Sequence, residues 1–394
     1  MALFAQHGYG KGEKINNGLI NDEISGVIFS PKAEPLIKLK TYIKKIRKIN
    51  SKAKIYFDPQ FYICALQGDI VSSKLISYEY CNLSLSRGVL SDYKYLNHMC
   101  EQVFDVQAIL EVSEYFSPTI RFADFDDKDS QIALNLAKLS CEKITKADSS
   151  LYVSLCINEA AFNDYEKMNA FLDIITLLDV KGFYIIIDRN IINSKVNEIN
   201  PSTLANIMVF IHSLSLFNGF DVIVGYSDLL SLPLAAVSNA DFATGWFSNT
   251  KRFSITNFVR ASGGHRPKKR YTSGVLMNTV LLLPEFKAFL DTKLINNIIT
   301  ESPYNKNLIP KFEESQWSDE ISCLHNWHII KQLVQYLQME KDIGDRLSCF
   351  QSMIDNAKKS YENIKSPIPL DHSSKGGHLN MWSEAIKIFK ESMV

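Results

Sequence analysis

The sequence predicts an α/β protein, a (β/α)8 barrel with an insertion after its second predicted strand and a helical extension at its C-terminus. The chain has 394 residues, of which 46% are hydrophobic and 22% charged, the composition of a folded protein long enough for a large barrel. Short apolar runs alternate with amphipathic stretches over the first three quarters of the chain. No GxGxxG or GxxxxGK motif follows any apolar run, which disfavours the rival fold, an open doubly wound sheet.

Eight apolar runs are predicted as strands. They lie at 26–30, 54–58, 119–123, 151–157, 182–188, 221–226, 240–246 and 271–283. The fifth run, GFYIIID, is continuous, as expected for a parallel strand that is covered on both faces. Helical spacing of apolar residues fills the intervals, for example at 34–49 and 131–144. This alternation is typical of a closed barrel of βα units.

The predicted elements divide the chain into three parts: an N-terminal segment at 1–23, the barrel at 24–285 and the helical extension at 286–394. The segment at 67–117 is too long for a strand–helix connection, so we interpret it as an insertion into the barrel. The longest apolar run, 274–284, is too short to span a bilayer, and we expect no membrane association.

Charge and cysteine content limit the class of protein. Lys and Arg total 43, and so do Asp and Glu, so a charged partner must be bound by a local cluster of charge. The seven cysteines are scattered and never spaced as CxxC, and no secretory signal precedes them. This pattern predicts free thiols and a cytoplasmic location.

Candidate catalytic residues follow the predicted strands, because barrels place their active sites at the C-terminal ends of strands. Asp58 and Asp188 end two apolar strands, where burial of a charge costs free energy, and Asp124 follows a third. Such carboxylates can act as general acids and bases, and they can also hold Mg²⁺. The alternative is that rim aspartates cap helices and form turns. The cofactor stays open, with Mg²⁺ as one option.

A basic tract lies near the end of the predicted barrel. No acidic residue occurs between Asp241 and Glu285. The predicted phosphate-binding or substrate-binding residues of this region are Arg252, His265, Arg266, Lys268 and Arg270, with Trp246 and Tyr226 as aromatic neighbours. Arg and Lys beside a glycine-containing loop suit phosphate oxygens, and Trp246 suits stacking on a base. The alternative is a solvated basic loop that pairs with acidic residues elsewhere.

Two segments resemble the tRNA-guanine transglycosylase superfamily. GYSDLLSLPLAAVSNADFAT at 225–244 is similar to the passage between the sixth and seventh strands of that family. LHNWHIIKQLVQYL at 324–337 is similar to the His-Asn helix that follows its barrel. The resemblance implies a (β/α)8 barrel that exchanges a purine base in a nucleic acid, with one aspartate as nucleophile and another as general base.

The chain departs from the family pattern at its site residues. Thr244 stands at the position of the nucleophilic aspartate, while Asp58 corresponds to the general base, without the family's Asp-Ser-Gly sequence. The zinc cysteines expected upstream of His325 are absent from 296–316. His325 and His328 lie three residues apart on one predicted helix, but no Cys pair at zinc-site spacing accompanies them, so we expect a hydrogen-bonded pair and no zinc.

Three functions are consistent with these patterns. The first is an enzyme acting on a nucleic acid, nucleobase or nucleotide at the barrel rim, such as a base-exchange or glycosidic-bond enzyme without zinc. The second is a non-catalytic barrel that serves as a nucleic-acid- or protein-binding subunit of a modification or genome-defence complex. The third is a barrel enzyme acting on a phosphorylated small molecule. The direction in which the rim aspartates point discriminates the first from the second.

Overall fold

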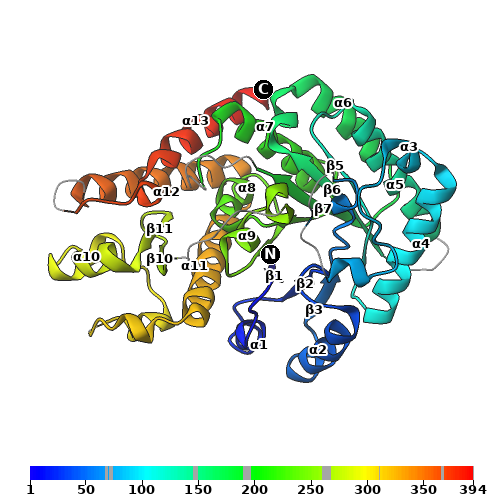
Figure 1. Ribbon diagram of the computed structural model, residues 1–394. Coiled ribbons are helices and arrows are strands. Elements are labelled where there is room, and N and C mark those ends of the chain that lie inside the picture. The colour runs from blue at the N-terminus through cyan, green and yellow to red at the C-terminus, as the bar shows by residue number, and fades with distance from the viewer. Residues whose placement is uncertain are drawn as a thin grey trace.

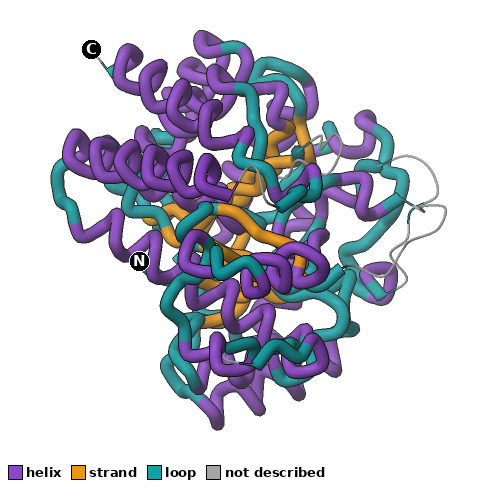
Figure 2. Tube along the Cα trace, turned by 90° about the vertical axis from the view of Figure 1, so that its left-hand side faces the viewer, coloured by secondary structure: helices purple, strands orange, loops and turns teal. Residues whose placement is uncertain are grey.

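The structure is a computed structural model of residues 1–394 that describes residues 1–66, 70, 74–144, 150–189, 197–259, 268–309, 311–364 and 368–393. It is a nearly closed barrel of parallel strands surrounded by helices (Figures 1 and 2), which confirms the predicted fold class. The barrel strands are β1 (Leu3–Gln6), β2 (Gly26–Phe29), β3 (Lys54–Phe57), β4 (Tyr115–Phe116), β5 (Arg121–Phe122), β6 (Leu151–Asn158), β7 (Gly182–Asp188), β8 (Asp221–Gly225) and β9 (Asp241–Thr244).

These strands occupy eight positions around the barrel. They are ordered β3-β2-β1-β9-β8-β7-β6, and the short strands β4 and β5 share the eighth position because both pair with β6. The gap between β3 and β4 is bridged at Ser113, whose N–H donates to the carbonyl of Ile55 at 2.7 Å and whose Oγ accepts from the Ile55 N–H at 2.9 Å. All residues of β7 are buried, as its continuous apolar sequence predicts.

Helices lie around the barrel and, in the C-terminal part of the chain, beyond it. They are α1 (Lys14–Ile20), α2 (Leu36–Ile49), α3 (Arg87–Leu90), α4 (Tyr93–Leu110), α5 (Lys128–Ile144), α6 (Tyr165–Ile175), α7 (Pro201–His212), α8 (Ser231–Ala235), α9 (Ser248–Lys251), α10 (Lys287–Asp291), α11 (Asp319–Met339), α12 (Ile343–Ile364) and α13 (Gly377–Ser392). In α2 the buried residues Leu39, Ile43 and Ile46 recur at helical spacing. Asn200 caps α7, whose first residue is Pro201.

The N-terminal boundary of the predicted barrel is wrong. Residues 3–6 form β1, which pairs with β2 on one side and β9 on the other, so the segment at 1–23 contributes the first strand of the barrel. Each of the first seven predicted strands therefore occupies the barrel position one later than predicted. The four-residue run Leu3–Gln6 carries too little periodicity to be recognised from its sequence.

The predicted eighth strand at 271–283 is also not a barrel strand. It is an antiparallel hairpin of β10 (Arg270–Ser273) and β11 (Asn278–Leu281) outside the barrel, turning at Met277, whose φ is 50°. Helix α11 takes the place of the eighth barrel helix, because it packs between α8 and α1. The predicted C-terminal extension thus completes the barrel, and α12 and α13 lie beyond it, with α13 against α7 (Figure 1).

The insertion at 67–117 supplies a helix of the barrel. Its described part contains α4, which packs against α2 and α5 in the third helix position and is longer than the predicted helix at 102–112. In the part of the chain that the structure describes, no helix combines the length and apolar character needed to cross a membrane.

Candidate functional site

Asp58 lies at the C-terminal end of the barrel, directly after β3, and is 1% exposed. Its carboxyl accepts hydrogen bonds from the backbone N–H of Gln60 at 3.0 Å and from the hydroxyl of Tyr62 at 2.9 Å. Within the described ranges no Lys, Arg or His forms an ion pair with it. Burial raises the pKa of Asp58 to about 7, although the bonds from Gln60, Tyr62 and Tyr184 oppose the shift. The carboxyl is therefore balanced between its two protonation states near neutral pH.

Tyrosines surround this carboxyl inside the barrel mouth. Tyr184 comes from the interior face of β7, and Tyr226 follows β8; both are at most 7% exposed. Tyr184 donates to Gln6 of β1 at 3.3 Å. Burial and the nearby Asp58 carboxyl raise the pKa values of Tyr62, Tyr184 and Tyr226, so all three hydroxyls stay protonated and able to donate.

Strained backbone marks the loops at this rim. Gln60, two residues after Asp58, has φ 53°, Tyr226 has φ 54° and Asp228 has φ 39°. Positive φ is uncommon for residues with a Cβ and costs about 1–3 kcal/mol when the surroundings enforce it. Backbone strain of this kind concentrates at functional sites, and here it occurs on the two loops that carry Asp58 and Tyr226.

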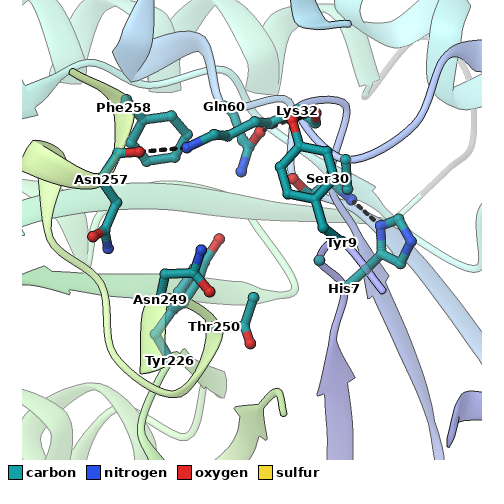
Figure 3. Close-up of a pocket in the computed structure, with 12 residues that line it drawn as sticks. His7, Tyr9, Ser30, Lys32, Gln60, Tyr226, Asn249, Thr250, Asn257 and Phe258 are labelled. Carbon is teal, nitrogen blue, oxygen red and sulfur yellow. Dashed lines mark hydrogen bonds between the residues drawn. The ribbon is translucent and has the colours of Figure 1, made fainter. Parts of the chain in front are cut away.

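A small pocket lies at this rim, and Gln60, two residues after Asp58, forms part of its wall (Figure 3). It holds about 30 Å³, room for a water molecule. Its lining includes His7, Lys32, Gln60, Tyr226, Thr250 and Phe258. Gln60 connects the pocket to the carboxyl, because its N–H bonds Asp58 while its side-chain carbonyl accepts from the Lys32 N–H at 3.1 Å.

Lys32 is the cation of this pocket. In Figure 3 its side chain extends over the ring of Phe258, with Nζ 3.9 Å from the ring centroid, and donates to the carbonyl of Asn257 at 2.5 Å. No carboxylate of the described residues pairs with Lys32. Burial lowers its pKa to about 8. An ammonium with only a carbonyl and a π face for partners suits an anionic or carbonyl group of a ligand.

His7 adds an unused hydrogen-bonding group to the pocket lining. Its Nδ1 accepts from the Ser30 N–H at 3.4 Å, while its Nε2 is buried without a hydrogen-bond partner. Burial, reinforced by Lys11, lowers the pKa of His7 to about 3, so the ring is neutral. Because Nδ1 accepts, we assign the ring proton to Nε2.

Asp188 ends β7 and is as buried as Asp58, and both of its carboxylate oxygens accept hydrogen bonds. It forms an ion pair with Arg121 at 2.6 Å and accepts from Asn158 Nδ2 at 2.9 Å and from the Ile255 N–H at 2.8 Å. The bond to Ile255 fixes the segment that carries Phe253 and Phe258. Asp188 thus anchors this segment through its contacts, and its predicted catalytic role stays a prediction.

Asp124 lies away from this site. Its side chain is 43% exposed, it pairs with Lys167 at 2.8 Å, and it accepts from the Asp126 N–H within its own turn. These are the contacts of a turn-forming surface residue, the alternative considered from the sequence. In the described part of the chain, no group of three or more His, Cys, Asp and Glu side chains is arranged to hold a metal ion.

A larger cleft of about 480 Å³ lies on the other side of α9. Five basic side chains line it: Lys251, Arg252, Lys268, Lys269 and Arg270. Trp246 and Phe247 form an apolar part of its wall, and the carboxylates of Asp228, Asp319 and Asp371 also border it. The predicted residues Arg252, Lys268, Arg270 and Trp246 are thereby brought together, whereas Tyr226 lies in the neighbouring pocket. His265 and Arg266 fall outside the described residues.

Arg252 has a side-chain nitrogen in this cleft wall that lacks a hydrogen bond. Its Nη1 is buried without a hydrogen-bond partner, and burial lowers the pKa of its guanidinium. Arg270 is committed to structure, since it donates to Thr279 and to Ser374 Oγ and so ties the β10–β11 hairpin to the C-terminal region. Trp246 is 8% exposed and donates to the Tyr9 carbonyl at 2.7 Å, which fixes its ring in the cleft wall.

Asp228 is a further buried aspartate that borders this cleft. It is 6% exposed and accepts from Thr244 Oγ1 at 3.2 Å and from Asn326 Nδ2 at 3.0 Å, with Lys251 Nζ 3.7 Å away. Asn326 belongs to the predicted His-Asn helix. Its neighbour His325 is buried and hydrogen-bonded to the Thr272 carbonyl and to Ser302, as expected for a packed histidine.

No direct signal in the sequence marks Tyr62, Tyr184 and His7 as site residues. Tyr184 is a polar side chain inside an apolar strand, and this position is the one signal for a residue of the barrel interior. His7 follows β1, a strand too short to be recognised from its pattern. No protein-family model matches the chain, and no curated protein matches it.

Proposed function

We propose that the protein is an enzyme that breaks or exchanges a bond to a nucleobase in a nucleotide or nucleic acid, with Asp58 as the group that exchanges the proton. The observation that carries the proposal is the Asp58 carboxyl, which is buried at the barrel rim, has no cation partner among the described residues and has a pKa near 7. Burying such a group costs stability, so its retention favours a chemical role. A carboxyl with this pKa can protonate a leaving base and remove the proton again.

The basic cleft supports the substrate class. Arg252 offers a partnerless guanidinium nitrogen, and Lys251, Lys268 and Lys269 add positive charge around it. Guanidinium and ammonium groups suit phosphate oxygens, and the ring of Trp246 beside them suits a base. A nucleic-acid substrate and seven free cysteines fit a cytoplasmic location.

One short segment connects the cleft with Asp58. Lys251 and Arg252 face the cleft, while the next residue, Phe253, packs its ring 5.1 Å from Tyr62 and 5.2 Å from Tyr226. Phe258 packs on Tyr62 as well, at 6.2 Å. Arg252 therefore belongs to the segment whose phenylalanine rings lie over the tyrosines around Asp58. A substrate whose phosphate binds Arg252 can reach Asp58 only when these two rings move.

The packing of Phe253 and Phe258 over these tyrosines also favours a second candidate, a non-catalytic binding subunit. With Phe253 and Phe258 packed over the tyrosines, Asp58 is 1% exposed and lines neither the small pocket nor the basic cleft. If these two rings never move, the cleft alone binds the nucleic acid and Asp58 has no reaction to perform.

Binding tests the substrate class. We expect the purified protein to bind tRNA or single-stranded DNA with an affinity that falls steeply with salt, because phosphate contacts release counterions. Arg252→Met and Lys251→Met should each flatten the slope by about one phosphate contact. Lys387→Met, which removes an exposed charge on α13, is the matched control and should leave the slope unchanged. Absence of binding to tRNA and to single- and double-stranded DNA at low salt would contradict the proposal.

Turnover discriminates the two candidates. Release or exchange of a base from tRNA, followed by chromatography of the freed base, should fall by about 10²–10⁴-fold in Asp58→Asn, the range typical for loss of a general acid–base group. Binding by this variant should be unchanged. Wild-type protein that binds tRNA but releases and exchanges no base would favour the binding subunit.

A further inference from the structure

We infer that Cys64 and Cys81 form a dithiol site that reacts with a hydroperoxide and closes to an intrachain disulfide. The two Sγ atoms lie 3.9 Å apart, although 17 residues separate them in the sequence. Cys64 is buried and Cys81 is partly exposed. The inference does not depend on the proposed function.

The surrounding fold holds the two thiols face to face. The Leu85 N–H donates to the Cys64 carbonyl at 2.9 Å, and the hydroxyl of Tyr80, next to Cys81, donates to the Pro59 carbonyl at 2.7 Å. Tyr80 is itself fully buried. The segment at 80–85 is therefore hydrogen-bonded to the segment at 59–64. These bonds hold the two thiols close together in the folded protein.

The two cysteines have unequal roles. A hydrogen bond from the Cys64 thiol lowers the pKa of Cys81, and the same bond raises the pKa of Cys64. Thiolates are the nucleophiles of cysteine chemistry, and solvent access admits the oxidant. Cys81 is thus the attacking residue and Cys64 the resolving one.

The chemistry balances with one peroxide. The Cys81 thiolate attacks a peroxide oxygen, so an S–O bond forms, the O–O bond breaks and hydroxide leaves; sulfur loses two electrons and the peroxide gains them. Cys64 then gives up its proton and attacks the Cys81 sulfur. The S–S bond forms as the S–O bond breaks, and the second oxygen leaves as water.

Closure affects the neighbourhood of Asp58. Cys64 directly follows the short helix Phe61–Ile63, which carries Tyr62 and its hydrogen bond to Asp58. A disulfide has an S–S length of about 2.05 Å, so the sulfurs must approach by roughly 2 Å. This movement pulls on the helix that positions the Tyr62 hydroxyl.

The test counts thiols. Fully reduced protein is treated with stoichiometric hydrogen peroxide, denatured, alkylated and digested, and the peptides are identified by mass spectrometry. We expect two of the seven cysteines to be lost to alkylation, a linked peptide joining Cys64 to Cys81, and recovery of both thiols with dithiothreitol. Alkylation of all seven cysteines, or a disulfide between any other pair or between two chains, would overturn the inference.

Variants assign the two roles. Cys64→Ser, which keeps a hydrogen-bond donor, should stop the reaction at a Cys81 sulfenic acid that dimedone traps. Cys64→Ala, which lacks the donor, should form the same sulfenic acid more slowly. Cys81→Ser should leave Cys64 reduced. Cys349→Ser, at another partly exposed cysteine, is the matched control and should form the disulfide as the wild type does. Unmodified Cys81 in both Cys64 variants would contradict the assigned order.

Discussion

Asp58 and Asp188 stand at equivalent places, each at the end of an apolar barrel strand and each 1% exposed, yet their surroundings are opposite. Asp188 has a cation, an amide and a backbone N–H for partners. The partners of Asp58 among the described residues are a backbone N–H and tyrosine hydroxyls and include no cation. Position on the strand therefore does not decide the role. Burial without a described cation raises the pKa of Asp58 and leaves this carboxyl able to bind a proton near neutral pH.

The largest expected effect is the pH dependence that Asp58 gives to stability. Its pKa is about 7 in the folded protein and 3.8 as its ordinary value, so the folded state binds the proton more tightly. Its contribution to the free energy of unfolding therefore falls as pH rises from about 4 to about 7. Three pKa units correspond to about 4 kcal/mol.

Urea unfolding of wild type and Asp58→Asn across this pH range measures that contribution. The stability of the wild type relative to the variant should fall with increasing pH and level off above about 7. Taking the difference isolates Asp58, because His7 and His325, whose pKa values are lowered to about 3, titrate in both proteins. Parallel curves for the two proteins would show that Asp58 is an ordinary ionised carboxylate.

Asp188→Asn should have the next largest effect, a loss of about 3 kcal/mol in the free energy of unfolding at neutral pH, since it leaves Arg121 without its carboxylate in a largely buried site. The loss of the Ile255 anchor should also make the segment with Phe253 and Phe258 exchange its amide hydrogens faster. Unchanged stability at pH 7, measured by urea unfolding, would remove the distinction between the two carboxyls.

Asp124→Asn should have the smallest effect. Its ion pair with Lys167 is exposed, and such pairs are screened by water and salt. We expect urea unfolding and nucleic-acid binding to match those of the wild type, which makes this variant the control for replacing a rim aspartate by asparagine. A loss as large as that of Asp188→Asn would mean that replacing any rim aspartate destabilises the protein.

The barrel could be predicted because long apolar strands such as Gly182–Asp188 and their amphipathic helices carry local periodicity. The first strand and the hairpin after residue 269 could not, since four-residue strands carry too little pattern and pairing partners are remote. The end-of-strand rule located Asp58 and Asp188 correctly at the rim. It could not separate them, because Arg121 is 67 residues from Asp188 and its pairing is set by the closed barrel.

The protonation state of Asp58 tests the account most directly. Carbon-13 NMR of protein labelled at the aspartate carboxyl carbons, with Asp58→Asn to assign the resonance, follows this carboxyl as the pH is raised from 5 to 9. We expect a protonated carboxyl at pH 5 and a titration midpoint near 7. A carboxyl that is already ionised at pH 5 would contradict the proposed proton exchange and leave Asp58 as a second structural anion beside Asp188.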